Sequence, residues 1–85
     1  MEEFQVIINI HKDGSPSGII FICSNDIKRS IEKFLCLIFQ SEMSLARITP
    51  GKTTTTIELE SDDEMKVALL QQILHEINFE GVNPN

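Results

Sequence analysis

Residues 19–39 read IIFICSNDIKRSIEKFLCLIF, and residues 55–79 read TTIELESDDEMKVALLQQILHEINF. Each stretch begins with an apolar strand, passes through a serine followed by acidic or amide residues, and ends in an amphipathic helical run. Ser24 and Ser61 occupy equivalent places in the two stretches. Another strand-like run closed by a turn precedes each stretch. The chain therefore predicts two ββα units in tandem.

The first unit opens with a strand that has one buried face. Residues 4–11 alternate between apolar and more polar side chains, which is the period of two expected of such a strand. Glycine, proline and serine at 13–18 predict a turn. Residues 19–23 then return as a second strand that is apolar on both faces, so both of its faces should be covered. Ser24 or Asn25 is predicted to cap the first helix.

The second unit repeats this order with different chemistry. Residues 43–49 predict a third strand, followed by a turn at 49–52 and a fourth strand at 53–60. On the fourth strand, Thr55, Ile57 and Leu59 are expected to point inward. Ser61 and Glu64 match the capping box that starts a helix.

The element order predicts an α+β fold with a four-stranded, mostly antiparallel sheet and both helices on one face. We expect one domain over residues 1–80 and a flexible C-terminal tail over 81–85. The other face of the sheet would then carry apolar side chains, and such patches mark interfaces. We therefore predict a protein partner in a homo- or heterodimer, bound through Ile7, Ile19, Phe21 and Leu45 on the open face and Leu37 and Phe39 at the end of the first helix.

Composition narrows the class of protein. The chain has seven Lys and Arg against thirteen Asp and Glu, a net charge of −6. This balance argues against direct nucleic-acid binding as the main activity, since phosphate contacts need clustered basic residues. No apolar run is long enough to span a membrane, and the N-terminus does not match a signal peptide. Two cysteines are too few for a disulfide framework, so we expect a cytoplasmic protein with reduced thiols.

The motifs that could carry chemistry have simpler structural interpretations. Residues 46–53 loosely match a phosphate-binding loop, but a strand follows instead of a helix and Pro50 removes a donor. His11 and His75 lack the neighbours of a metal site. Cys36 falls late in its helix, where the helix dipole opposes a thiolate, and Cys23 is expected in the core. We therefore expect no catalytic residue, metal or cofactor, and predict that the protein is not an enzyme.

Acidic residues crowd one corner of the predicted fold: Glu58, Glu60, Asp62, Asp63 and Glu64. They could bind a cation or imitate a phosphate backbone. We favour the structural interpretation, in which the strand glutamates are solvated and the aspartates serve the helix start.

The stretch from Thr55 to Phe79, with ALLQQIL at 68–74, resembles the small dimerisation subunit of the KEOPS tRNA-modifying complex. The resemblance covers about a third of the chain and lies mostly in hydrophobic spacing. It departs from that family at Val67, where an arginine is usual, and in its N-terminal hairpin. It implies a short α+β protein that pairs and docks onto a larger catalytic subunit.

The leading hypothesis is therefore a non-catalytic interaction and dimerisation module, an accessory subunit in tRNA processing. The alternative is a small acidic inhibitor of the phage type, which would block a basic surface through the acidic corner. A third hypothesis is a small ligand bound between protomers. Salt sensitivity separates the first two, because exposed charges are screened by salt while apolar contacts are not.

Overall fold

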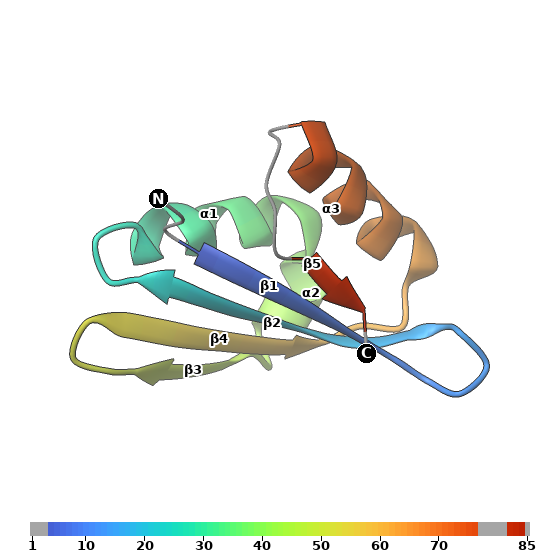
Figure 1. Cartoon of the computed structure of the whole chain (residues 1–85), viewed down its shortest axis with the longest axis horizontal. Coiled ribbons are helices and arrows are strands. Elements are labelled where there is room, and N and C mark those ends of the chain that lie inside the picture. The colour runs from blue at the N-terminus through green and yellow to red at the C-terminus, as the bar shows by residue number, and fades with distance from the viewer. Residues whose placement is uncertain (1–3, 77–81, 85) are drawn as a thin grey trace.

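The computed structural model describes residues 4–76 and the backbone of residues 82–84 (Figure 1). The elements follow in the order β1 (Phe4–Ile10), β2 (Pro16–Ser24), α1 (Lys28–Ile38), α2 (Gln40–Met43), β3 (Arg47–Pro50), β4 (Thr54–Glu60), α3 (Glu64–Glu76) and β5 (Val82–Pro84). The predicted α+β fold with two ββα units is confirmed. The short elements α2 and β5 are additions that the sequence pattern did not indicate.

The strands form one sheet in the order β3-β4-β2-β1-β5. The four predicted strands are antiparallel to their neighbours, and β5 adds to β1 in parallel. The central neighbours β2 and β4 come from different ββα units. Strand β5 falls within the tail expected at 81–85, where a strand was not foreseen, and residues 81 and 85 lie outside the described part. The domain boundary at residue 80 stays a prediction.

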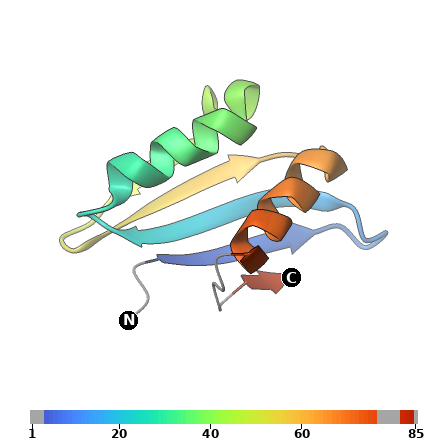
Figure 2. The same ribbon diagram turned by 90° about the horizontal axis from the view of Figure 1, so that it is seen from above.

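Helices α1 and α3 cover the same face of the sheet (Figure 2). The core lies between them and the strands, and its side chains alternate along each strand as a period of two requires. Phe21 pairs with Val6 on one side and with Ile57 on the other, and all three are fully buried. The rings of Phe4 and Phe21 stack with centroids 6.1 Å apart. Each helix contributes buried apolar residues: Ile31 and Leu35 from α1, and Val67, Leu70 and Leu74 from α3.

The helix starts differ from the predicted caps. Asp63 caps α3, because its Oδ1 accepts hydrogen bonds from the backbone N–H groups of Met65 and Lys66. The expected cap, Ser61, instead accepts a bond from the N–H of Asp63. Helix α1 has no side-chain cap. Asn25 is used elsewhere: its Nδ2 donates to the carbonyls of Gly51 and Lys52.

No helix in the described part of the chain is both long and apolar enough to cross a membrane.

Candidate functional site

Strand β4 is longer than the edge strand beside it. Strand β3 pairs with β4 only from Pro50 opposite Thr55 to Arg47 opposite Glu58. Strand β4 continues to Glu60, which pairs with Gly18 of the neighbouring strand β2. We call Leu59–Glu60 the β4 overhang, because β2 covers one side of it and β3 does not reach the other.

The overhang exists because the chain before β3 turns away from the sheet. The predicted third strand at 43–49 is wrong in its first half, since residues 40–43 form α2. Two turn bonds follow, from the N–H of Leu45 to the carbonyl of Glu42 at 3.2 Å and from the N–H of Ala46 to the carbonyl of Met43 at 3.2 Å. Strand pairing can therefore begin only at Arg47.

The backbone of Glu60 points to the uncovered side. In an antiparallel sheet, the N–H and C=O of one residue point to the same neighbour, and this direction alternates along the strand. The carbonyl of Thr54 accepts from the N–H of Gly51 at 2.8 Å on the β3 side, whereas the carbonyl of Thr53 accepts from Asn25 at 3.0 Å on the β2 side. The pairing of β4 with β2 runs without a bulge to Glu60. The N–H and C=O of Glu60 therefore face the β3 side, where no described residue forms a backbone hydrogen bond with them.

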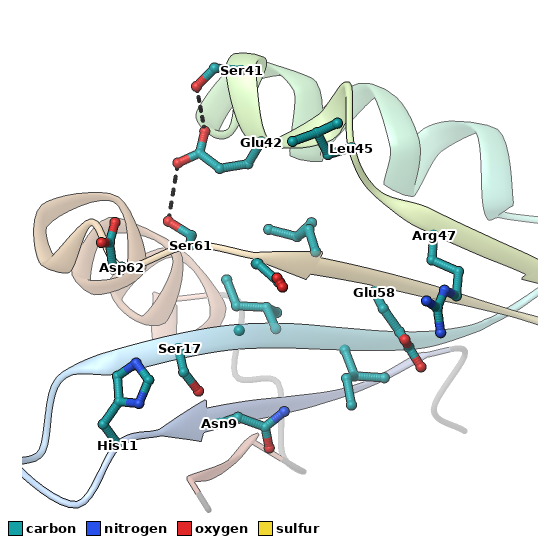
Figure 3. Close-up of a pocket in the computed structure, with 15 residues that line it drawn as sticks. Asn9, His11, Ser17, Ser41, Glu42, Leu45, Arg47, Glu58, Ser61 and Asp62 are labelled. Carbon is teal, nitrogen blue, oxygen red and sulfur yellow. Dashed lines mark hydrogen bonds between the residues drawn. The ribbon is translucent and has the colours of Figure 1, made fainter.

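An open groove of about 1100 Å³ lies along the overhang (Figure 3). Ser41, Glu42 and Leu45 form one wall, and the floor is the end of β4 with Ser61 and Asp62. Asn9 of β1, Ser17 of β2 and His11 of the turn between these strands line the other side. The side chain of Leu45 is 90% exposed and stands over this space.

Glu42 fixes the α2 wall to the end of the sheet. Its carboxylate accepts hydrogen bonds from Lys66 Nζ at 3.0 Å, Ser41 Oγ at 2.9 Å and Ser61 Oγ at 3.1 Å. Burial favours the neutral acid, but the bonds from Lys66, the backbone, Ser41 and Ser61 outweigh it and lower the pKa of Glu42 to about 2. Glu42 is thus ionised and already paired.

The remaining charges of the groove are mainly negative. Glu58, Glu60 and Asp62 line it, with Arg47 as the facing basic residue. Figure 3 shows Glu58 and Arg47 side by side, and the two residues are opposite one another in the pairing of β3 with β4. The two remaining members of the predicted acidic corner, Asp63 and Glu64, belong to the start of α3 instead.

The predicted partner-binding residues fall into two groups. Leu37 and Leu45 are 80% and 90% exposed, and Ile7 lies half-buried on the open face of the sheet. Their role in binding stays a prediction. The placement of Ile19 and Phe21 on the open face is wrong, since both are fully buried under the helices.

The apolar pattern of the second strand explains why Ile19 and Phe21 were placed on the wrong face. A strand that is apolar on both faces does not reveal which set of side chains points inward, and the pairing with β1 sets Ile20 and Ile22 on the open face instead. Phe39 is also wrong as a contact residue, because its side chain is fully buried in the core where α1 ends.

The two cysteines, which are the candidate nucleophilic thiols, differ in burial. Cys23 is buried and donates to the carbonyl of Thr55 at 3.7 Å. Burial raises its pKa, the charge of Glu32 raises it further, and Lys28 partly opposes this, so the neutral thiol is favoured. Cys36 is exposed. Within residues 4–76, no three histidine, cysteine or acidic side chains are grouped to hold a metal ion.

No protein-family model matches the sequence, and no curated protein matches it. The fold is similar to the essential ribosomal processing protease Prp from S. aureus in complex with a substrate peptide, with a TM-score of 0.52, 16% identity, and coverage of 96% of this chain and 97% of that one. A hypothetical protein from Staphylococcus aureus matches with a TM-score of 0.48, 15% identity, and coverage of 96% and 99%. At these identities the likeness shows the fold alone.

The comparison corrects the functional predictions. The resemblance to the KEOPS subunit is contradicted, because the fold is similar to that of Prp. The prediction of a non-catalytic accessory module in tRNA processing, and with it the acidic-inhibitor alternative, is contradicted because the similar fold is that of a protease. The prediction that the chain is not an enzyme is contradicted on the same ground.

Proposed function

We propose that this protein binds an extended peptide segment of another protein, which adds as a short strand at the β4 overhang. One observation carries the proposal: the N–H and C=O of Glu60 face an open groove without a backbone partner among the described residues. A strand edge of this kind is a template for an incoming chain, and main-chain hydrogen bonds then supply affinity.

Two further features support peptide binding. Prp, whose fold is similar, was solved with a substrate peptide bound. The groove also combines an exposed apolar residue, Leu45, with the polar backbone of Glu60. Sites that bind a peptide as an added strand use main-chain hydrogen bonds for affinity and side-chain contacts for specificity.

The net charge of the chain favours a different protein as the partner. The sequence left homo- and heterodimers open, and we propose a different protein because two chains that each carry a net charge of −6 repel one another. Cytoplasmic residence, as the sequence predicts, is part of the proposal.

Removal of one donor tests the proposal. In Glu60→Pro the backbone N–H is lost, whereas Glu60→Ala keeps it and removes the same carboxylate. The pairing of β4 with β2 does not use this N–H, so both variants should fold. We expect a peptide that binds the native protein, measured by fluorescence anisotropy, to bind Glu60→Ala and to lose at least tenfold in affinity for Glu60→Pro. Equal binding by the two variants would contradict strand addition.

A measurement on the native protein complements the variants. Amide hydrogen exchange at Glu60 should slow when the peptide is bound, because its N–H becomes hydrogen-bonded. The N–H of Leu59 points to β2 and is the internal control. Unchanged exchange at Glu60 when the peptide is bound would show that the peptide binds elsewhere.

Peptide cleavage is a second candidate function, favoured by the protease fold that the chain shares with Prp. Cys36 is the thiol to test, because it is exposed whereas Cys23 is buried as the neutral form. Mass spectrometry of the peptide after incubation should reveal products with the native protein and none with Cys36→Ser. Intact peptide in both samples would contradict cleavage and leave peptide binding standing.

A further inference from the structure

We infer that Glu60 selects the bound segment by charge, so that the segment carries lysine or arginine at the position opposite Glu60. This inference rests on the proposed function and deepens it. We place the segment antiparallel to β4, as β3 is. Directly opposite residues of an antiparallel pair place their side chains on the same face, with Cα atoms about 5.5 Å apart when they exchange both hydrogen bonds. The residue that pairs with the backbone of Glu60 therefore also stands beside its carboxylate.

The surroundings of Glu60 leave its carboxylate available. Its neighbour on the inner side is Gly18, which has no side chain to cover it. The ion pairs in the described part of the chain are Lys28–Glu32 and Lys66–Glu42, so Glu60 takes part in neither. The side chain of Glu60 is exposed at the rim of the groove. An incoming cation would thus meet an unpaired carboxylate.

The other acidic residues of the groove differ from Glu60 in their partners. Glu58 lies two residues away on the same face, and Arg47 stands opposite it. Glu42 is held by Lys66. A cationic side chain opposite Glu60 would have Glu58 as its diagonal neighbour, which adds attraction. An anionic side chain at that position would meet two carboxylates.

Charge complementarity also decides between a foreign segment and a second copy. A second copy brings a net charge of −6 to a groove that is itself acidic. A segment with a lysine or arginine meets an attractive potential instead, which also speeds its association.

Three peptides that differ only at one central residue, lysine, glutamine or glutamate, test the inference. We expect the affinity for the native protein to fall in that order, with a loss of about two- to fivefold from lysine to glutamine, the range of one cross-strand charge pair. The affinities of the same peptides should differ less for Glu60→Gln than for the native protein, because only the diagonal neighbour Glu58 then remains. Glu60→Lys should reverse the order. Glu76→Gln, which removes an exposed charge at the end of α3, is the matched control and should keep the native order.

The outcomes separate this inference from the proposed function. Equal affinity of the three peptides for the native protein would overturn charge selection while leaving strand addition intact. A lysine preference that is undiminished in Glu60→Gln and is lost in Glu58→Gln would overturn the assignment to Glu60. Failure of every peptide to bind would overturn the proposed function and this inference together. Because Glu60 is exposed, its replacement does not disturb the core.

Discussion

Nζ of Lys66 lies 3.0 Å from Oε1 of Glu42 and 3.2 Å from Oε2, so one ammonium group contacts both oxygens of a single carboxylate. The pair joins α2 to α3, which are separated in sequence by the whole β3–β4 hairpin. It therefore holds the wall of the groove against the helix that follows the overhang.

The Glu42 contacts predict an acid-sensitive contribution to stability. Its pKa falls from 4.5 to about 2 on folding. The stabilisation is therefore complete above the unfolded pKa and is lost as the pH falls from about 4.5 towards about 2. With allowance for solvent screening, we expect it to amount to about 1–2 kcal/mol.

Urea unfolding at neutral and acidic pH measures this contribution. Glu42→Gln should be less stable than the native protein at neutral pH, and the difference should shrink in acid. Glu76→Gln should follow the native pH profile. A constant difference between Glu42→Gln and the native protein at every pH would contradict the prediction.

Asn25 predicts a second stability effect at the opposite end of the sheet. Its side chain donates to the carbonyls of Gly51 and Lys52 and accepts from the hydroxyl of the buried Thr55 at 2.5 Å. Asn25→Ala leaves that hydroxyl without its acceptor, and we expect a loss of about 1–3 kcal/mol in the free energy of unfolding.

A double-mutant cycle with Thr55→Val tests whether Asn25 stabilises the fold through the hydroxyl of Thr55. In the Thr55→Val background, Asn25→Ala should lower the free energy of unfolding by less, because no buried hydroxyl is then left without an acceptor. Strictly additive effects in urea unfolding would show that the two side chains act independently.

The end of α1 offers a comparison between neighbouring apolar residues. Phe39 is fully buried, and Leu37 is 80% exposed. Phe39→Ala should destabilise the fold by about 3–5 kcal/mol through the lost contacts and the cavity left behind. Leu37→Ala should change the free energy of unfolding by less than about 0.5 kcal/mol. Similar thermal shifts for the two variants would contradict the burial seen here.

The two cysteines should differ in reactivity. Cys36 is exposed and should react with a thiol reagent in the native protein, while Cys23 should react only after unfolding because it is buried and its pKa is raised. Peptide mapping by mass spectrometry after brief native labelling assigns each modification. Native labelling of Cys23 at the rate of Cys36 would show that the core opens freely.

The sequence predicted the fold because its strong patterns are local. The inward set Thr55, Ile57 and Leu59 is confirmed, with exposures of 1%, 0% and 3%. The buried face of the second strand could not be predicted from its own residues. Residues 19–23 are apolar on both faces, and only their pairing with β1 decides which side chains are buried. The start of α3 was predicted, but its cap was not, because both Ser61 and Asp63 are suitable cap residues and the structure uses Asp63.

The candidate site could not be predicted, because it depends on where a strand stops. Residues 40–46 contain no β-branched side chain, which was the available signal that the third strand starts late. The direction of the Glu60 backbone follows from the register of three strands, which no local pattern contains. Strand β5 was missed because three residues after a glycine carry too little pattern to indicate a strand.

The central position of β2 beside β4 has a consequence for how the chain could be divided. These two strands belong to different ββα units. Each unit therefore contributes residues to one shared hydrophobic core, and neither unit has a separate core. A chain severed between α2 and β3 should yield two halves that stay unfolded alone and regain the native circular dichroism spectrum when mixed. The protein would then serve as a split reporter, whose signal depends on the meeting of its halves.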